Sequence, residues 1–432
     1  MPDAIFPPTL VAARERIAAI DPAAYARSRN MLEGAVSRLS PYLTHGVVST
    51  ARVLVDVSAR HRLAIDHKLV FELGWREYFR HVWQHRGEGI FESLHEGLLP
   101  DDAYGRELPQ DIREGRTGVP AIDAAVRSLY ATGYLHNHAR LWLASYIVHL
   151  RKVHWRCGAD WLYGHLIDGD LASNHLSWQW VAGTGSSKPY LFNAENVARF
   201  APAHWHSPRS VIDTSYEALD LLARRAAPVP AQPAGQGVEE PALFIEAPAL
   251  LHAPPAAPLS TPGPSQPAAK PEDVRGRDVW LVHPWALGEP PRDLPANTFR
   301  LGFYSAEFHS RRAWSETRWA FVDQRMRTLA DTCLHADTAT LAGLLGAARS
   351  VRTVSDPHIG TALHAVAEVR PAERIFADVT RPCESFSRWW KEATRGVRNL
   401  HDLPGLAAIA AAPADPSDDF EVNTFQVQET QE

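Results

Sequence analysis

Polar and aromatic residues recur at helical spacing in the segment Glu72-Leu-Gly-Trp75-Arg76-Glu77-Tyr-Phe79. On a helix, Glu72, Trp75 and Arg76 share one face, to which Phe79 also belongs. A carboxylate, a guanidinium group and an indole on one face can line a pocket for a planar heterocycle. An exposed Glu72–Arg76 ion pair beside a core tryptophan has the same pattern, so this segment alone leaves both interpretations open.

A second cluster occupies a break between two apolar helical segments. Asp168 and Asp170 flank a glycine there, and Asn174, Trp178 and Trp180 follow at helical spacing. Carboxylates can accept hydrogen bonds from ring N–H and ribose hydroxyl groups, and neighbouring indoles can pass single electrons. The same residues are also typical of a turn or a weak calcium loop followed by core tryptophans.

Two further motifs lie at expected helix starts. Ser37 and Ser40 precede Pro41, where hydroxyl and amide groups can hold a phosphate or simply cap the helix. The segment Tyr134-Leu-His136-Asn137-His138-Ala-Arg140 begins another helix. Its histidines have no spacing that favours zinc, so we expect no metal site.

These motifs need a framework, and the sequence predicts one that is helical over residues 1–205. Apolar residues recur every three or four positions in segments such as 69–80 and 139–150. Residues 206–275 are expected to form a helical extension and then a Pro/Ala-rich linker, with 12 prolines from Pro228 to Pro271. The apolar island 242–251 in this linker either docks on a neighbour or is a stray patch.

Strands and helices alternate after the linker, which indicates a small parallel α/β domain at 276–405. Expected strands are 278–283, 299–304, 350–354 and 374–378, and expected helical stretches are 314–346, 357–368 and 383–395. We expect an acidic disordered tail at 406–432. The predicted fold class is therefore multidomain, an all-helical domain followed by a parallel-sheet, Rossmann-like α/β domain.

Composition limits the compartment and the class of partner. The chain has three cysteines, Cys157, Cys333 and Cys383, and it lacks both a signal-like start and a long apolar run. We therefore expect a reduced, cytoplasmic protein that does not contact a membrane. The formal net charge of −6 argues against nucleic acid, but the balance is +1 over residues 1–205 and −7 over the rest. A local basic rim from Arg76, Lys188 and Arg199 is therefore compatible with DNA.

The order and spacing of the motifs resemble the flavin-binding domain of the photolyase/cryptochrome family. The similarity runs from about Phe6 to Pro202. It is carried by Ser37-Arg-Leu-Ser40-Pro-Tyr-Leu, Glu72-Leu-x-Trp75-Arg76-Glu77, Glu114-Gly-Arg-Thr-Gly118-Val-Pro-Ala-Ile-Asp123, His136-Asn137-x-x-Arg140 and Asp168-Gly-Asp170-Leu-Ala-Ser-Asn174 with Trp178-Gln-Trp180.

The resemblance implies an all-helical domain that binds FAD. Phosphate contacts would come from Tyr25, Ser37, Leu39 and Ser40. Around the flavin ring it implies an Arg140–Asp168 pair, Asp170 as an acceptor and Asn174 at flavin N5, with Arg76 and Asn137 also near the cofactor. Trp178 would donate electrons to the flavin, and Trp155 would be the second member of the relay.

The resemblance also implies a substrate cavity formed by Glu72, Trp75, Asn137 and Trp180. In family members that split cyclobutane pyrimidine dimers, excited reduced FAD passes an electron to a flipped-out dimer, and the ring opens. The expected function is therefore light-driven repair of DNA containing pyrimidine dimers, a carbon–carbon lyase activity. The alternative is a cryptochrome-like blue-light receptor that acts on an unknown signalling partner, and a flavoprotein without photochemistry ranks third.

Several positions depart from the family pattern. No tryptophan lies between Trp83 and Trp142, so the third relay position is missing, and Tyr104, Trp161 or Trp142 are alternative exits. A phosphate-side threonine is replaced by Val36, and His138 stands where an arginine is usual, with only partial charge near neutral pH. The α/β domain, which precedes the flavin domain in the family, would follow it here, and whether it binds an antenna chromophore is undecided.

Overall fold

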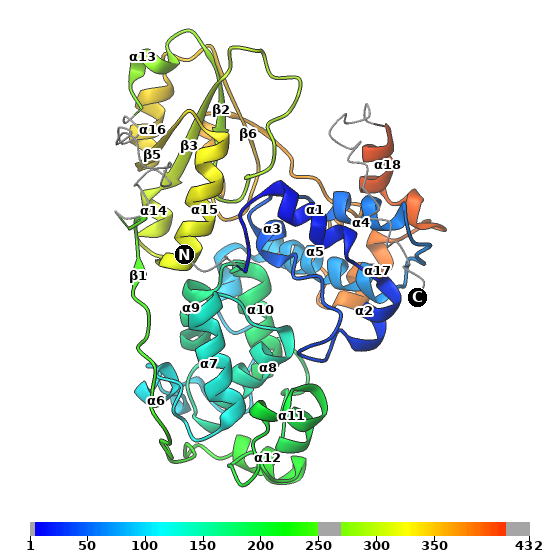
Figure 1. Ribbon diagram of the computed structural model, residues 1–432, viewed down its shortest axis with the longest axis vertical. Coiled ribbons are helices and arrows are strands. Elements are labelled where there is room, and N and C mark those ends of the chain that lie inside the picture. The colour runs from blue at the N-terminus through cyan, green and yellow to red at the C-terminus, as the bar shows by residue number, and fades with distance from the viewer. Residues whose placement is uncertain (1–4, 249–268, 412–432) are drawn as a thin grey trace, which may run out of the picture.

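The computed structural model describes residues 5–248 and 269–411 (Figure 1). Up to residue 226 every regular element is a helix, as predicted. The α-helices are α1 (Leu10–Ala18), α2 (Pro22–Ser28), α3 (Ser40–Thr44), α4 (Thr50–Ser58), α5 (Lys68–Arg86), α6 (Gln110–Arg113), α7 (Pro120–Thr132), α8 (Asn137–Ser145), α9 (Trp155–His165), α10 (Leu171–Ala182), α11 (Ala194–Phe200) and α12 (Tyr216–Ala223).

Local sequence sets the ends of these helices. Asp21 caps α2 by accepting hydrogen bonds from the amides of Ala23 and Ala24, and Pro22 occupies the first helical position. Asp170 caps α10 by accepting from the amide of Ser173. The helix then ends at Gly183, whose φ of 80° suits a left-handed C-terminal residue. The predicted site residues at 168–180 therefore begin at a sharply defined helix start.

A five-stranded parallel sheet follows the linker, in the order β5-β3-β2-β6-β7. Its strands are β2 (Asp278–Val282), β3 (Phe299–Ser305), β5 (Thr332–Ala336), β6 (Ser350–Val354) and β7 (Glu368–Arg370). Helices α13 (Pro271–Val274), α14 (Ala306–His309), α15 (Glu316–Leu329) and α16 (Thr338–Leu345) accompany them, and α15 packs on β3 and β5 (Figure 1). The predicted class, helical with a parallel α/β part, is confirmed.

Three secondary-structure predictions in this part are wrong. Residues 374–378 form no strand, because the amides of Ile375 and Phe376 donate to the carboxylate of Glu77 and not to a sheet. The stretch 314–346 is not one helical region, because β5 lies inside it and pairs with β3. Most of 357–368 is also non-helical, with only a short 3₁₀ turn at Ala362–Ala365.

The linker lies against the helical part of the molecule. Its amides at Val229, Ala234 and Val238 donate to carbonyl groups of that part. The apolar island contributes strand β1 (Leu243–Phe244), which pairs antiparallel with β4 (Trp314–Ser315). The docking interpretation of the island is therefore confirmed for β1, whereas residues 249–268 lie outside the described part of the chain.

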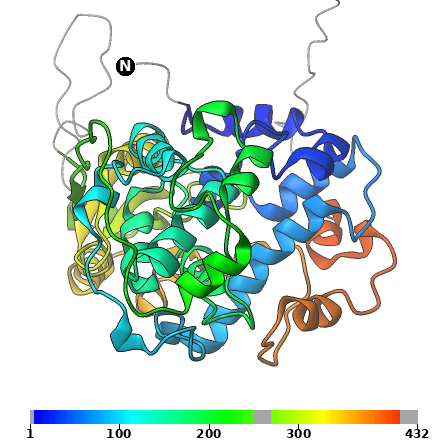
Figure 2. The same cartoon turned by 90° about the horizontal axis from the view of Figure 1, so that it is seen from below.

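The chain returns to the N-terminal helices after the sheet. Helix α17 (Phe386–Ala393) packs on α5, and α18 (Pro404–Ala411) packs on α4. From below, both lie beside α4 and α5, on the side away from the sheet (Figure 2). The start of the predicted disordered tail is thus helical up to 411, and residues 412–432 lie outside the described part. The domain boundaries at 205, 275 and 405 stay predictions.

One continuous apolar core joins the two kinds of structure. It contains side chains of α4, the central strand β2 and the returning helix α17, such as Leu54, Leu281 and Trp389. A second core lies between α7, α8, α9 and α10. None of the described helices is both long and apolar enough to cross a lipid bilayer.

Candidate functional site

Two buried carboxylates form the centre of the candidate site. Asp168 and Asp170 lie between α9 and α10, and their side chains are 2% and 1% exposed. Nη2 of Arg140 donates to both oxygens of Asp168 at 2.9 and 2.7 Å, and its Nε donates to the carbonyl oxygen of Leu135 at 2.9 Å. The expected Arg140–Asp168 pair is therefore present and holds its carboxylate in a fixed orientation.

Asp170 faces two arginines of α5. Its Oδ2 lies 3.5 Å from Nη2 of both Arg76 and Arg80, while its Oδ1 caps α10. Burial raises the pKa of Asp170, but the two guanidinium groups and the helix cap outweigh burial and hold that pKa well below its usual range. Arg76 also donates to Thr44 Oγ1 at 3.2 Å, so it belongs to this network and is not part of the exposed basic rim that we expected.

The predicted phosphate segment offers donors that have no partner among the described residues. The Ser37 and Ser40 hydroxyls make no hydrogen bond to any residue that the structure describes, and no side chain caps α3. Arg38 has a φ of 50°, which turns the chain sharply between them, and Leu39 is buried. Free hydroxyl and amide groups at a turn suit a pyrophosphate, so this segment fits the phosphate part of FAD.

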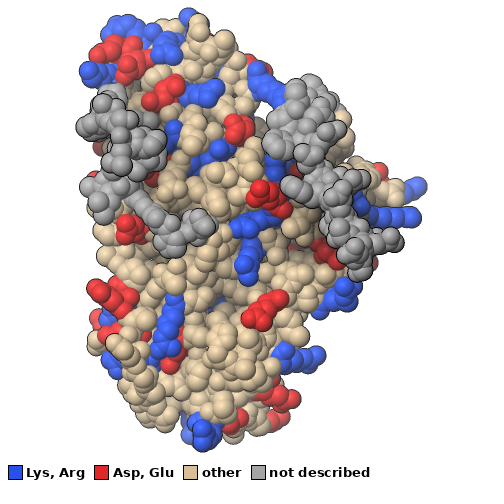
Figure 3. Space-filling model, in the orientation of Figure 1, with Lys and Arg blue, Asp and Glu red and all other residues tan. Residues whose placement is uncertain are grey.

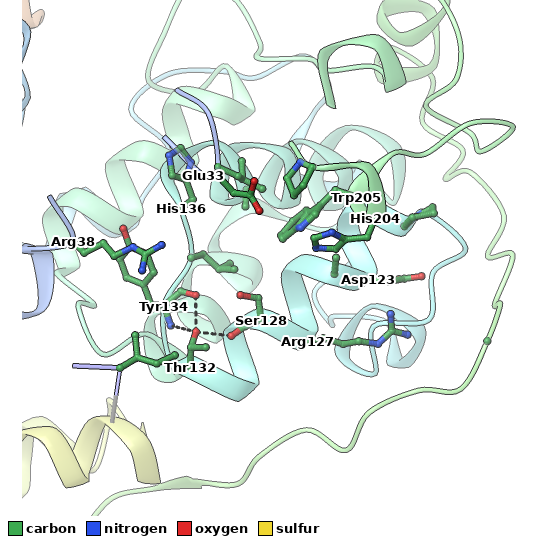
Figure 4. Close-up of a pocket in the computed structure, with 18 of the residues that line it drawn as sticks. Glu33, Arg38, Asp123, Arg127, Ser128, Thr132, Tyr134, His136, His204 and Trp205 are labelled. Atoms are coloured by element: carbon green, nitrogen blue, oxygen red, sulfur yellow. Dashed lines mark hydrogen bonds between the residues drawn. The ribbon is translucent and has the colours of Figure 1, made fainter. Parts of the chain in front are cut away.

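A cavity of about 800 Å³ lies against this segment. Arg38 and Tyr134 lie at one end of it, and His204 and Trp205 lie at the other (Figure 4). Apolar side chains, among them Leu135, form much of its wall. The residues predicted to contact the cofactor do not line it, although Arg38, His136 and Ala139 are chain neighbours of four of them.

Asn174 and the two relay tryptophans lie further along α9 and α10. The Asn174 side chain is buried, and its Nδ2 donates to the carbonyl oxygen of Ala159 at 2.8 Å. Trp178 packs directly on Gly158, where any side chain would collide with the indole. Gly158 lies about one helical turn after Trp155, whose Nε1 donates to Ser93 Oγ at 3.0 Å. Both tryptophans predicted for the relay are buried: Trp155 is the first residue of α9, and Trp178 packs against α9.

Of the three expected relay exits, only Tyr104 is connected to Trp155 by consecutive ring contacts among the described residues. The His154 ring lies 5.6 Å from that of Trp155 and 6.4 Å from that of Tyr104, which is only partly buried. Trp161 donates to Glu240, and Trp142 donates to Asn196. Within the described residues, neither of these two makes a ring contact with Trp155, so Tyr104 is the best placed exit.

The four cavity residues do not share one set of contacts. The Glu72 side chain is 45% exposed and pairs with Arg29 at 3.2 Å. The carbonyl oxygen of Arg29 accepts a hydrogen bond from His136, which precedes the exposed Asn137. Burial raises the pKa of Tyr25, which lies near Glu72. Arg29 therefore contacts Glu72, Tyr25 and, through His136, the start of α8, where Asn137 lies.

The two cavity tryptophans have other neighbours. Trp75 stacks on Phe386 of α17 at 4.2 Å with an interplanar angle of 10°, and Trp180, 40% exposed, lies 5.6 Å from Tyr190. The three α5 side chains have different partners: Glu72 pairs with Arg29, just after α2, Trp75 stacks on Phe386 of α17, and Arg76 pairs with Asp170. Whether they line one cavity stays a prediction.

His138 also differs from expectation. Its ring lies between Phe200 at 4.8 Å and Trp142 at 5.8 Å, and burial lowers its pKa. Burial therefore disfavours the charged form of His138, and its ring contacts are aromatic.

Three residues that contact predicted site residues are absent from the predicted set: Arg80, Arg29 and Thr44. Arg80 follows Arg76 by four residues, so helical spacing could have indicated it. Arg29 and Thr44 carry no such signal, because they meet α5 only through the fold.

Residues 69–205 match the family model described as the FAD binding domain of DNA photolyase. This segment is a photolyase-type FAD-binding domain. Its cofactor is FAD, for which the free hydroxyls at 37–40 and the buried Arg140–Asp168 pair supply suitable partners. Among the described residues, no group of histidine, cysteine, aspartate and glutamate side chains could hold a metal ion.

Curated relatives carry two different names. The chain is 36% identical over 155 residues to the deoxyribodipyrimidine photo-lyase of Streptomyces griseus, an alignment of 35% of this chain and 33% of the relative. It is 36% identical over 174 residues to the cryptochrome DASH of Synechocystis, covering 38% and 35% of the two chains. The chain thus spans about a third of the length of these relatives. A crystal structure of a Synechocystis cryptochrome matches with 27% identity and a TM-score of 0.41 over 51% of this chain and 53% of that one.

Proposed function

We propose that the protein is a light-driven DNA repair flavoprotein that splits cyclobutane pyrimidine dimers. When bound and reduced, FAD would supply an electron to the dimer on absorbing light. The other tasks, which are to bind the lesion, orient the flavin and return it to the reduced state, fall to this chain. The proposal rests on the arrangement around Glu72.

Arg29 pairs with the exposed Glu72 carboxylate, and its carbonyl oxygen accepts from His136, the chain neighbour of the exposed carboxamide of Asn137. Pyrimidine rings present N–H donors and carbonyl acceptors at their edge, which Glu72 and Asn137 can pair with. The ion pair with Arg29 at 3.2 Å holds the Glu72 carboxylate in one direction. Trp75 and Trp180 each have a partly open indole that can pack on a base.

A second set of residues, Arg140, Asp168, Asp170, Asn174, Trp178 and Trp155, would serve the flavin and not the lesion. The Arg140–Asp168 pair offers one N–H donor edge and one carboxylate edge to a heterocycle, and Asp170 adds a second fixed negative charge. Asn174 can donate and accept at flavin N5. Trp178 and Trp155 would carry electrons inward from the surface, with Tyr104 as the exit.

The DNA would meet a surface of mixed charge. Figure 3 shows Lys and Arg side chains interleaved with Asp and Glu on the face it presents. Lys188 and Arg199 are exposed, which suits contacts to phosphates on the rim. We expect the affinity for DNA to fall as the salt concentration rises, and we expect few phosphate contacts because the positive side chains are interspersed with negative ones.

The test is illumination of the full chain with dimer-containing DNA and a reductant. We expect loss of dimers in the light but not in the dark. Glu72→Gln should lower the repair yield at least tenfold with FAD content unchanged, because the amide keeps the shape but not the charge. Glu107→Gln, an exposed carboxylate on the segment before α6 and away from α2, is the matched control (Figure 1). Persistence of dimers with a fully reduced flavin would refute repair.

The Trp75–Phe386 stack favours the second candidate, a cryptochrome-like blue-light receptor. Through this stack, a predicted cavity residue is in direct contact with helix α17, close to the C-terminus. A change at the flavin could therefore reach the C-terminal segment and, through it, a signalling partner. Light-dependent proteolysis of the segment after residue 371, in a protein that leaves dimers intact, would support the receptor over repair.

A further inference from the structure

The loop that carries the two buried carboxylates is held from both parts of the molecule. From the N-terminal part, Thr44 Oγ1 donates to the carbonyl oxygen of Asp168 at 3.2 Å, and His45 Nε2 lies 2.8 Å from that of Ile167. Two further contacts come from Arg318 and His358, which lie 149 and 187 positions after the loop residues that they contact. They belong to the α/β part, on α15 and just after β6.

Arg318 makes the first of these contacts. Its Nη2 donates to the carbonyl oxygen of Gly169 at 2.6 Å, and its Nη1 donates to that of Tyr163 at 3.1 Å. The side chain is 0% exposed and lies over the rings of Trp314 and Tyr163, at 4.1 and 4.6 Å from their centroids. A buried cation is costly unless groups of negative charge compensate it. Here two carbonyl dipoles do so.

The glycine between the carboxylates makes this contact possible. A Cβ atom at Gly169 would collide with Nη1 of Arg318 and with the carbonyl oxygen of Tyr163. Asp168 and Asp170 also favour the charged form of Arg318, although burial lowers its pKa. The Asp-Gly-Asp spacing therefore admits a guanidinium group from the α/β part between two acidic residues.

His358 makes the second contact. Its Nε2 accepts a hydrogen bond from the amide of Leu171 at 3.2 Å, so its proton lies on Nδ1, which is 2.6 Å from Asp356 Oδ1. The ring stacks on Trp285 at 4.6 Å, with an interplanar angle of 7°. Asp356 Oδ2 pairs with Arg80 at 3.0 Å, and Arg80 pairs with Asp170. A continuous polar chain therefore joins the end of β6 to Asp170.

We infer that Arg318 and His358 are positioning residues for the flavin, supplied by the α/β part to the Asp168–Asp170 loop. Neither belongs to the segment matched by the FAD-binding family model, which ends at 205. They fix the loop backbone on both sides of Asp170, and Arg318 adds a positive charge next to both carboxylates. The inference rests on the proposed placement of Asp168 and Asp170 beside the flavin.

Loss of Arg318 has two expected effects. The loop loses two hydrogen bonds, so Asp168 and Asp170 are less well oriented and FAD binds more weakly. The region also becomes more negative, which disfavours added negative charge on the flavin and makes its midpoint potential more negative. Both effects can be measured without any assay of repair activity.

The experiment compares Arg318→Met with Arg325→Met in the full chain. Arg325 lies on the same helix and is also buried, but it donates to Leu287 and pairs with Glu289, away from the loop. We expect Arg318→Met to raise the dissociation constant of FAD at least tenfold and to lower the two-electron midpoint potential by about 30 mV or more, where 30 mV is a tenfold change in the equilibrium constant. Arg325→Met should change neither. Equal effects of both variants would overturn the inference.

Two further variants separate the possible failures. His358→Phe retains the stack on Trp285 but removes the acceptor for Leu171, and it should weaken FAD binding even if Arg318→Met fails to fold. Asp168→Asn tests the proposed flavin site itself. If Asp168→Asn weakens FAD binding and neither Arg318→Met nor His358→Phe does, the inference is wrong and the proposed site stands. If Asp168→Asn has no effect, the placement of the flavin is wrong.

Discussion

A largely buried carboxyl on α5 should make the stability of the protein depend on pH. Glu77 accepts hydrogen bonds from the amides of Ile375 and Phe376 at 2.6 and 3.3 Å, and it thereby fastens the returning segment to α5. Burial raises the pKa of Glu77 from its ordinary value of 4.5 to about 7, even though both amides favour the ionised form. The folded state therefore binds this proton more tightly than the unfolded state.

The sign of the effect comes from that difference. The stabilisation by the proton on Glu77 is complete below pH 4.5 and is lost as pH rises to 7. A difference of this size between the two pKa values corresponds to at most about 3 kcal/mol. Glu77→Gln removes the titration, although it sacrifices part of the hydrogen bonding to the two amides, at about 1 kcal/mol. The variant should be less stable than the parent at pH 5 and more stable, by up to about 2 kcal/mol, at pH 8.

The assay is denaturant unfolding of both proteins at pH 5, 6, 7 and 8. Histidines also titrate over this range, but they are common to both proteins and cancel in the difference. Glu88→Gln, an exposed position near the end of α5, is the control and should leave the difference near zero at every pH. A stability difference between Glu77→Gln and the parent that stays constant from pH 5 to 8 would refute the reasoning.

Three other predictions concern the flavin side. Asp168→Asn should raise the FAD dissociation constant at least tenfold, measured by flavin fluorescence, and should lower the free energy of unfolding by about 2 kcal/mol because Arg140 loses a charged partner. Trp155→Phe should slow light-driven reduction of bound FAD at least tenfold in transient absorption, and Tyr104→Phe should slow it less, whereas an unchanged rate in Tyr104→Phe would exclude this exit. Asn174→Asp cannot donate to the Ala159 carbonyl, so we expect a loss of about 1–2 kcal/mol in stability and a different flavin spectrum under steady illumination. An unchanged spectrum would count against Asn174 at N5.

Local sequence patterns predicted the elements whose signals are complete within a short segment. Helices α5 and α8 follow from the apolar periodicity at 69–80 and 139–150, and β2, β3 and β6 follow from buried β-branched and aromatic runs. The pattern failed for residues 374–378, which are apolar enough for a strand, because a single carboxylate at position 77 takes up their amides. It failed for β5 because Thr332–Ala336 is short and lies close behind a helix. Neither segment contains a sequence signal that identifies the distant residues with which it forms hydrogen bonds.

The same limit applied to the candidate site. The Arg140–Asp168 pair was expected from the family resemblance and is present, and Arg80 could have been inferred from its spacing to Arg76. Arg29, Phe386 and Arg318 could not, because each reaches the site from a separate part of the chain. The motifs thus predicted which residues are chemically suited to a flavin site, but not the neighbours that orient them.

Helix α5 shows why adjacent residues of one motif need not share a task. Successive side chains on a helix differ in direction by about 100°, so a helix packed on three sides assigns neighbouring positions to different partners. Here Trp75 stacks on α17, Arg76 pairs with Asp170, and Glu77 accepts hydrogen bonds from the returning segment at 375–376. The structure on either side of α5 is therefore mechanically linked through three consecutive residues. We therefore expect a substitution in the Asp170 network to alter the packing of α17 on α5. This expectation is the same whether the protein repairs DNA or acts as a receptor.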